Sequence, residues 1–234
     1  MTLRDNIFFI LYKPSVPGNI GASARAMKTM GFKNLRLIDA ADHLSDDAKM
    51  LAHGSHDILI SAGLYKTFDE AVSDLDFLVS TTANTAKNAK VDYVSSKALV
   101  NFIQNKEGFT GNIGIIFGTE ESGLPGEIIR RSNIGLTIPA QESYPSLNLS
   151  QAVMIIAYEL YTGIQTGEIE SKSESQPDAS WKALEKNTHD ILLKSGIKPL
   201  TPLYHRIIER MSMMSGTDAR LVHSIVNRIK DKLR

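Results

Sequence analysis

The sequence predicts an α/β fold with a parallel sheet covered by helices on both faces, followed by a small helical extension. The first observation is that short apolar runs alternate with stretches of helical periodicity over residues 1–163, a pattern typical of parallel sheets. The second is that several runs are almost wholly apolar, as expected of strands buried on both sides. The third is that residues 181–234 have helical patterns alone.

Five apolar runs are expected to form the strands of the sheet. All are short and bounded by polar or turn-forming residues, which suits a buried strand better than a helix. The runs are IFFILY (7–12), LRLI (35–38), DFLVST (76–81), IGIIFG (113–118) and IGLTIP (134–139).

Four stretches between these runs are expected to be helices, and a fifth helix closes the sheet domain. Gly31 directly follows the first of them and is a suitable C-terminal cap. The helices are ASARAMKTM (22–30), SDDAKMLAH (45–53), FDEAVSD (68–74), SSKALVNFIQ (95–104) and the segment from Asn148 to Tyr161.

A polar segment without aromatic side chains, residues 164–180, is expected to be a linker. It would separate a sheet domain, residues 1–163, from a helical domain, residues 181–234. Helical patterns in the second domain cover 181–196, 203–211 and 217–233. In the last of these, an apolar residue recurs every four positions, and we expect this stripe to pack against the rest of the domain. The stripe consists of Leu221, Ile225 and Ile229.

The composition excludes several classes of protein and site. The chain of 234 residues is 42% hydrophobic and 22% charged, as in ordinary soluble proteins, and no segment approaches the roughly 20 apolar residues of a membrane span. The absence of cysteine excludes disulfides and cysteine nucleophiles, and the six histidines lack metal-ligand spacing. The start of the chain does not resemble a secretory signal. We therefore expect a cytoplasmic protein with no membrane partner and no structural metal.

Charge is divided unevenly along the chain, although its formal net value is zero. Residues 1–177 carry 15 Lys and Arg against 20 Asp and Glu, a net of −5, whereas residues 178–234 carry 11 against 6, a net of +5. A basic tail on an acidic body is typical of an RNA-binding extension and equally of a solvated helical tail.

Ligands of parallel α/β sheets bind beyond the carboxyl ends of the strands, so the loops there are the candidate sites. The first strand is followed by KPSVPGNIGASARAMKTMGF. In this loop Gly18 and Gly21 are expected to form a tight turn, with Asn19 or Ser23 capping the next helix.

Arg25 and Lys28 follow on the polar flank of that helix. An arginine held near a strand end is suited to bind an anion such as an RNA phosphate, although an ordinary exposed arginine has the same pattern.

The other strand-end loops are TTANTAKNAK (81–90), GTEESGLPGE (118–127) and PSLNLSQAV (145–153). Glu120 and Glu121 are adjacent acids, but a metal site usually requires more carboxylates, so no metal is expected. In the last loop Asn148 can cap the following helix, with Gln151 completing a capping box. Alternatively, that loop holds a ligand against the start of the helix.

Three segments, read in order, resemble the three motifs of the SpoU/TrmH group of the SPOUT superfamily. They are NIGASARAMKTMGF, IIFGTEESGLP and IPAQESYPSLNLSQAV. Members of this group are S-adenosylmethionine (SAM)-dependent RNA 2′-O-ribose methyltransferases. The likeness is strongest to the TrmJ subfamily, which methylates position 32 of the tRNA anticodon loop. The resemblance implies tRNA as substrate, a homodimer, and a deep trefoil knot at the C-terminal side of the sheet.

The same resemblance implies the site residues. The catalytic residues would be Arg25, as general base or as charged stabiliser of the 2′-oxygen, with Asn19 and Glu120 orienting Arg25 or the ribose. RNA would contact Arg25, Lys28, Arg220, Arg228 and Lys230. SAM would be held by the backbone and side chains of Thr81, Thr82, Ala83, Gly118, Ile138, Ser146, Leu147 and Asn148.

Subfamily members carry arginines at the positions of Asn84 to Ala86 and of Thr119, which this chain lacks, so its RNA contacts are expected to differ. Three alternatives stay open on the sequence: an rRNA 2′-O-methyltransferase, a non-catalytic RNA-binding module with the same fold, and an NAD-dependent dehydrogenase. The last lacks the GxGxxG fingerprint after every strand.

Overall fold

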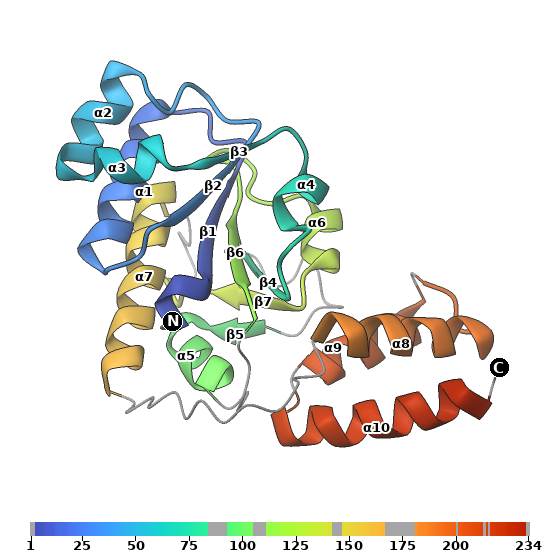
Figure 1. Cartoon of the computed structure of the whole chain (residues 1–234). Coiled ribbons are helices and arrows are strands. Elements are labelled where there is room, and N and C mark those ends of the chain that lie inside the picture. The colour runs from blue at the N-terminus through green and yellow to red at the C-terminus, as the bar shows by residue number, and fades with distance from the viewer. Residues whose placement is uncertain are drawn as a thin grey trace.

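The computed structural model describes residues 3–83, 93–104, 111–141, 147–166, 181–199, 201–212, 214 and 216–232. Within these residues a seven-stranded sheet has the order β3-β2-β1-β6-β4-β7-β5, and all neighbouring strands are parallel (Figure 1). The strands are β1 (Ile7–Tyr12), β2 (Asn34–Ile38), β3 (Gly63–Tyr65), β4 (Phe77–Thr81), β5 (Tyr93–Ser95), β6 (Ile113–Phe117) and β7 (Ile134–Thr137).

The five predicted strands are confirmed to within one or two residues at each end. The two edge strands, β3 and β5, were not predicted because each has three residues and no apolar run, GLY and YVS. Parallel pairing with a longer neighbour makes them strands, which short-range patterns do not reveal.

Helices cover both faces of the sheet (Figure 1). One face is covered by α1 (Pro17–Thr29), α5 (Ser96–Gln104) and α7 (Leu149–Thr166), with α2 (Asp46–Ala52) and α3 (His56–Ile60) packed against α1. The other is covered by α4 (Phe68–Val72) and α6 (Gly126–Arg131). Short 3-10 turns occupy Leu3–Asn6 and His53–Ser55. The two faces bury separate apolar cores, so the sheet is fully interior, as its apolar strands predict.

Helix α1 begins five residues earlier than predicted, and this corrects the interpretation of its glycines. Pro17 occupies the first turn, where its missing N–H is tolerated, and Val16 precedes the helix without a capping side chain. Gly18 and Gly21 therefore lie inside the helix and form no tight turn. Gly21 instead allows α2 to approach, because a Cβ there would lie 2.0 Å from the Ala48 carbonyl oxygen.

Gly31 has φ +76°, so its predicted role as the C-terminal cap of α1 is confirmed. The body of the protein ends with α7, which reaches Thr166 and so includes the first three residues of the predicted linker, 164–166. Residues 167–180 lie outside the described part of the chain.

The tail domain consists of α8 (Trp181–Lys194), α9 (Pro202–Ser212) and α10 (Gly216–Lys232). Leu184, Met211 and Val226, one from each helix, form a small core of its own. The three predicted tail helices are thereby confirmed. In Figure 1 the tail lies beside the end of the sheet that carries β5 and β7.

The predicted packing face of α10 is wrong. Leu221, Ile225 and Ile229 are 61%, 57% and 41% exposed, whereas Val222 and Val226, one position further along, face the tail core. Polar bonds also join α8 and α10. Asn187 Nδ2 donates to Asn227 Oδ1 (2.9 Å), and Lys230 Nζ donates to Asn187 Oδ1 (2.6 Å) and to Asp190 (3.1 Å). The stripe of larger side chains on α10 therefore faces solvent.

Candidate functional site

Three neighbouring strands end side by side, and the predicted loops meet at the edge of the sheet that their carboxyl ends form. The strands are β6, β4 and β7, which are adjacent in the sheet although they are separated in sequence. Gly118 follows β6, Thr82 and Ala83 follow β4, and Ile138 follows β7. The carboxyl ends of parallel strands are where such folds bind ligands, so this edge is the candidate site.

A chain of hydrogen bonds links three of the predicted residues across this edge. Asn19 Nδ2, in the first turn of α1, donates to Glu120 Oε1 at 3.0 Å. Asn148 Nδ2, before α7, donates to Asn19 Oδ1 at 3.0 Å. Because Asn19 both donates and accepts through one amide, its orientation is determined by these two partners. The loop after β6, helix α1 and the start of α7 are therefore held in one geometry.

Ser15 also belongs to this chain of bonds and was not predicted. Its backbone N–H and its hydroxyl both donate to Glu120 Oε2, each at 3.2 Å. Serine in a strand-end loop is too common for the sequence to have indicated this role. Both carboxylate oxygens of Glu120 are thus occupied, one by Ser15 and the other by Asn19.

A tight loop presents Glu120 to these donors. Thr119 and Gly123 exchange two backbone hydrogen bonds of 3.1 and 3.0 Å around it. Gly123 has φ +71°, a conformation that side chains other than glycine rarely adopt. The loop from β6 to α6 is therefore a closed turn.

Glu120 is held as a carboxylate. Burial acts to raise its pKa, but hydrogen bonds from Asn19, its own backbone and Ser15 outweigh this, so the pKa of Glu120 lies below the ordinary 4.5. The charged form is favoured by its donors, so these bonds are fully present above pH 4.5 and are lost as the pH falls through the lowered pKa.

We expect the side-chain amide of Asn19 to report this titration. In ¹⁵N-labelled protein, the Asn19 NH₂ signals should shift with a midpoint below pH 4.5, because protonation of Glu120 removes their acceptor. The amide of Asn34, which donates to the backbone carbonyls of Asp5 and Ile7, is the control and should not follow this titration. A midpoint at or above pH 4.5 would contradict the assigned bonding.

The capping role predicted for Asn148 is confirmed. Its Oδ1 accepts from the backbone N–H of Ser150 (2.9 Å), and Gln151 Oε1 accepts from the backbone N–H of Asn148 (3.2 Å), which is a capping box. The other end of the same amide contacts Asn19. Asn148 therefore caps α7 and contacts the strand-end site, and the interpretation that its loop holds a ligand stays a prediction.

The residues expected to hold SAM lie at this edge where the structure describes them. Thr81 Oγ1 donates to the Ile116 carbonyl (3.0 Å) and Thr82 N–H to the Leu136 carbonyl (2.9 Å), which ties the end of β4 to β6 and β7. Ile138 is half-buried against the core, and Leu147 is exposed beside Asn148. Ser146 lies outside the described residues.

The chemistry of these residues fits SAM. The set contains small, hydroxyl and apolar side chains with the accompanying backbone groups, and no charged side chain. The adenine base of SAM is neutral and planar, and pockets for such groups combine apolar side chains with a few placed backbone donors and acceptors.

Gly118 is packed too tightly to accept a side chain. A Cβ there would lie 2.1 Å from the Gly123 carbonyl carbon and 2.3 Å from the Leu124 nitrogen, both backbone atoms that cannot rotate away. The β6 strand end and the closed loop that carries Glu120 therefore touch at this position.

Gly118→Ala is expected to abolish SAM binding and to lower the free energy of unfolding by about 1–3 kcal/mol, because the loop must move to admit the methyl group. Calorimetry with SAM and thermal unfolding measure the two effects. Gly54→Ala is the matched control, since a Cβ at Gly54 meets nothing within 4 Å. Wild-type SAM affinity in Gly118→Ala would contradict this packing.

Arg25 and Lys28 lie on the exposed side of α1, as predicted, but their surroundings differ. Lys28 Nζ pairs with Asp57 (2.7 Å) and donates to the Gly54 carbonyl (2.9 Å), so its charge is already neutralised within the chain. Within the described residues Arg25 has neither an ion pair nor a side-chain hydrogen bond. Of the two cations predicted on α1, Arg25 is therefore the one without a partner among the described residues.

Of the tail residues predicted to bind RNA, one is exposed and another is paired within the chain. Arg228 is exposed on α10. Lys230 pairs with Asp190 and faces α8. The Arg220 side chain lies outside the described part of the structure.

Among the described residues there is no group of three or more His, Cys, Asp or Glu side chains placed to hold a metal. In the same part of the chain, no helix combines the length and apolar character of a membrane span.

Comparisons with known proteins agree with this geometry. A family model described as "SpoU rRNA Methylase family" matches residues 6–158, which include β1 and most of α7. A solved structure described as a probable methylase family protein from Haemophilus influenzae Rd KW20 has a TM-score of 0.68 at 25% identity. It covers 99% of this chain and 98% of that chain.

Two relatives are similar in sequence. One is described as "Uncharacterized tRNA/rRNA methyltransferase LasT" from Escherichia coli (strain K12), 34% identical over 97% of this chain and 98% of the relative. Another is a tRNA (cytidine-2′-O-)-methyltransferase TrmJ from Methanocaldococcus jannaschii. It is 40% identical over 67% of this chain and 67% of the relative.

Proposed function

This chain belongs to the SpoU methylase family, and on that premise we propose that it transfers a methyl group from SAM to a ribose 2′-hydroxyl of tRNA. The observation that carries the proposal is the bond chain Glu120–Asn19–Asn148. It joins one residue from each of the three family motifs at the edge where the fold binds ligands. We further propose position 32 of the anticodon loop as the target, which the resemblance to the TrmJ subfamily supports, and the cytoplasm as the location of the reaction.

Bound SAM would supply an electrophilic methyl group, and Thr81, Thr82, Ala83, Gly118, Ile138, Ser146, Leu147 and Asn148 would hold it. The protein's own contribution is positioning, because an in-line transfer needs the two reacting atoms aligned. Asn19 and Asn148, each oriented by two hydrogen bonds, would define one wall of the site.

Arg25 would act on the ribose. A guanidinium is effectively always protonated, so we assign it to binding the adjacent phosphate and stabilising negative charge on the 2′-oxygen as the proton leaves to water. Its exposure on α1 and its lack of a partner among the described residues support this role.

The decisive experiment is incubation of the protein with methyl-labelled SAM and total RNA, followed by mapping of the labelled nucleotide. Label on the 2′-oxygen of a tRNA anticodon-loop nucleotide is the expected result. Label in rRNA would favour the second candidate, an rRNA methyltransferase, for which the description of the matching family and the name of the LasT relative both provide support. Absence of label from all RNA would favour a non-catalytic RNA-binding module.

We propose that the active species is a homodimer that pairs through α1 and α7. Apolar side chains on these helices and on the loops before them are exposed. They are Val16, Leu147, Met154 and Tyr158, between 36% and 53% exposed. Burying them against a second copy would also enclose the site, which water otherwise reaches.

Sedimentation is expected to give a dimer of the 25.8 kDa chain. Met154→Glu should produce monomers with little activity, because it places a charge in the apolar interface. Leu193→Glu is the control, since Leu193 is exposed on α8 of the tail and not on α1 or α7. A fully active wild-type monomer would contradict the proposal.

The trefoil knot and the RNA-binding tail are further proposals. The adjacency of β6, β4 and β7 and the return of α7 onto α1 support the knot. The net charge of residues 178–234, together with exposed Arg206, Arg228 and Lys232, supports RNA binding by the tail.

A further inference from the structure

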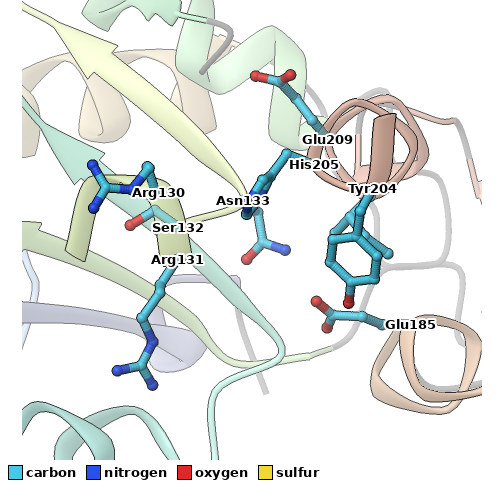
Figure 2. A pocket seen from close by; sticks show the side chains of 9 residues that line it. Arg130, Arg131, Ser132, Asn133, Glu185, Tyr204, His205 and Glu209 are labelled. Carbon is cyan, nitrogen blue, oxygen red and sulfur yellow. The ribbon is translucent and has the colours of Figure 1, made fainter. Parts of the chain in front are cut away.

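A cavity of about 230 Å³ lies between the body and the tail domain. It adjoins the start of β7, whereas the strand-end site lies beyond the end of β7. The body contributes the end of α6 and the two residues that precede β7, including Arg130 and Asn133. The tail contributes one residue of α8 and several of α9, including Glu185, Tyr204 and Glu209. In Figure 2 Asn133 projects toward the tail side chains Glu185, Tyr204 and Glu209, whereas the guanidinium groups of the two body arginines point away from the tail.

The lining has both signs of charge in equal number. Arg130 and Arg131 come from the body, and Glu185 and Glu209 come from the tail. Arg131 also pairs with Asp69 and lies over the Phe68 ring, 4.6 Å from its centroid. A phosphate or another free anion would meet two carboxylates here, so the lining suits a neutral group that carries both donors and acceptors.

Planar groups dominate the remaining surface. The rings of Tyr204 and His205 are perpendicular with centroids 5.7 Å apart, and Ile208 adds an apolar side chain one turn after Tyr204. Planar rings beside an apolar side chain are the surfaces on which unstacked nucleobases bind in proteins that recognise single-stranded RNA.

The lining is held in place before any ligand arrives. Asn133 Oδ1 accepts from the Leu78 backbone N–H at 2.7 Å, and the Tyr204 hydroxyl bonds His189 Nδ1 at 2.7 Å. Burial, and then Glu185, raise the pKa of Tyr204, so its hydroxyl keeps its proton at neutral pH. A pre-formed site loses little conformational entropy on binding.

We propose that this cavity between body and tail binds a single unstacked nucleobase. The base would stack on Tyr204, with carboxylates of the tail accepting its N–H groups and the Asn133 amide meeting a carbonyl or ring-nitrogen acceptor. The inference rests on the proposed RNA methyltransferase function. The base is not the methylated nucleotide, because the cavity precedes β7 whereas Ile138 of the strand-end site follows it, about 13 Å away along a four-residue strand.

The test measures binding of unfractionated tRNA to the full chain in the absence of SAM. Tyr204→Leu should weaken tRNA binding about tenfold, because it removes the aromatic ring on which the base stacks. Tyr204→Phe keeps the ring and should bind as the wild type does. Leu203→Ala, an exposed change on the same helix outside the cavity, is the matched control.

Glu209→Gln separates base recognition from general electrostatics by the sign of its effect. Removing a negative charge near RNA strengthens binding when only phosphates are contacted, whereas the loss of an acceptor for base N–H groups weakens it. We expect weaker binding. Glu127→Gln, which removes an exposed acid outside the cavity, should not weaken it.

Tyr204→Leu and Glu209→Gln binding tRNA as tightly as the wild type, or more tightly, would overturn the proposal. So would equal weakening by Tyr204→Leu and Tyr204→Phe, which would assign Tyr204 to its bond with His189. Titration with AMP, GMP, CMP and UMP distinguishes the source of the base. A mononucleotide that competes with tRNA and no longer binds to Tyr204→Leu supports the cavity as a general base site, and selective loss of tRNA binding alone supports a base within RNA.

These outcomes are independent of methyl transfer. Wild-type methylation of RNA together with unaffected tRNA binding by every cavity variant would overturn the nucleobase site and leave the proposed function intact. Absence of methylation together with weakened tRNA binding by Tyr204→Leu would overturn the proposed function and support the nucleobase site.

Discussion

Arg25→Ala is expected to abolish methyl transfer while SAM affinity stays close to that of the wild type. Removing a charged group that stabilises a developing oxyanion typically lowers turnover by about 10²–10³-fold. Arg25 is exposed on α1, outside the loops at the ends of β4, β6 and β7, so the residues proposed to hold SAM are untouched. Single-turnover methylation of tRNA and calorimetry with SAM measure the two quantities.

Arg25→Lys distinguishes how the charge acts. A simple electrostatic contact should keep part of the activity with lysine, whereas a planar, two-point contact to phosphate and ribose should keep almost none. Lys49→Ala, which removes an exposed cation from α2, is the control and should methylate as the wild type does. Wild-type turnover by Arg25→Ala would remove Arg25 from the reaction.

Removal of the tail is expected to weaken RNA binding strongly and to leave SAM binding intact. A chain ending at Thr166 keeps the whole of α7, both body cores and every residue proposed to contact SAM. It should therefore fold, because the tail core of Leu184, Met211 and Val226 is separate.

The salt dependence of binding shows what the tail contributes. For every RNA phosphate that the shortened chain no longer binds, the slope of log affinity against log salt should become shallower by roughly 0.7–0.9. Arg206→Ala and Arg228→Ala in the full chain should each account for part of this change, while Leu193→Ala, an exposed apolar control in α8, should account for none. A truncated body that binds tRNA with the affinity and salt slope of the full chain would assign the tail to bracing the structure.

The sequence by itself determined the class of fold, the central strands and the residues that lie at their ends. Fully apolar runs such as IFFILY and IGIIF can be buried on both faces only in a covered parallel sheet, and the loops after them then meet at one edge. Asn19, Glu120 and Asn148 could be singled out because they stand in those loops, and the motif resemblance added their roles. Asn148 as the cap of α7 followed from local spacing alone.

Only the tertiary structure decided which of these residues touch and which cations remain available. Glu120 is 101 residues from Asn19, and Asn148 is 129 from it, so their bonds depend on the packing of α1, α7 and the β6 loop. Ser15, the pairing of Lys28 with Asp57 and the outward face of Leu221, Ile225 and Ile229 depend on partners far along the chain. Local patterns report the preferences of neighbouring residues. The choice between two equally periodic faces of α10, or between a free and a paired lysine, is made by interactions that form only when distant segments pack together.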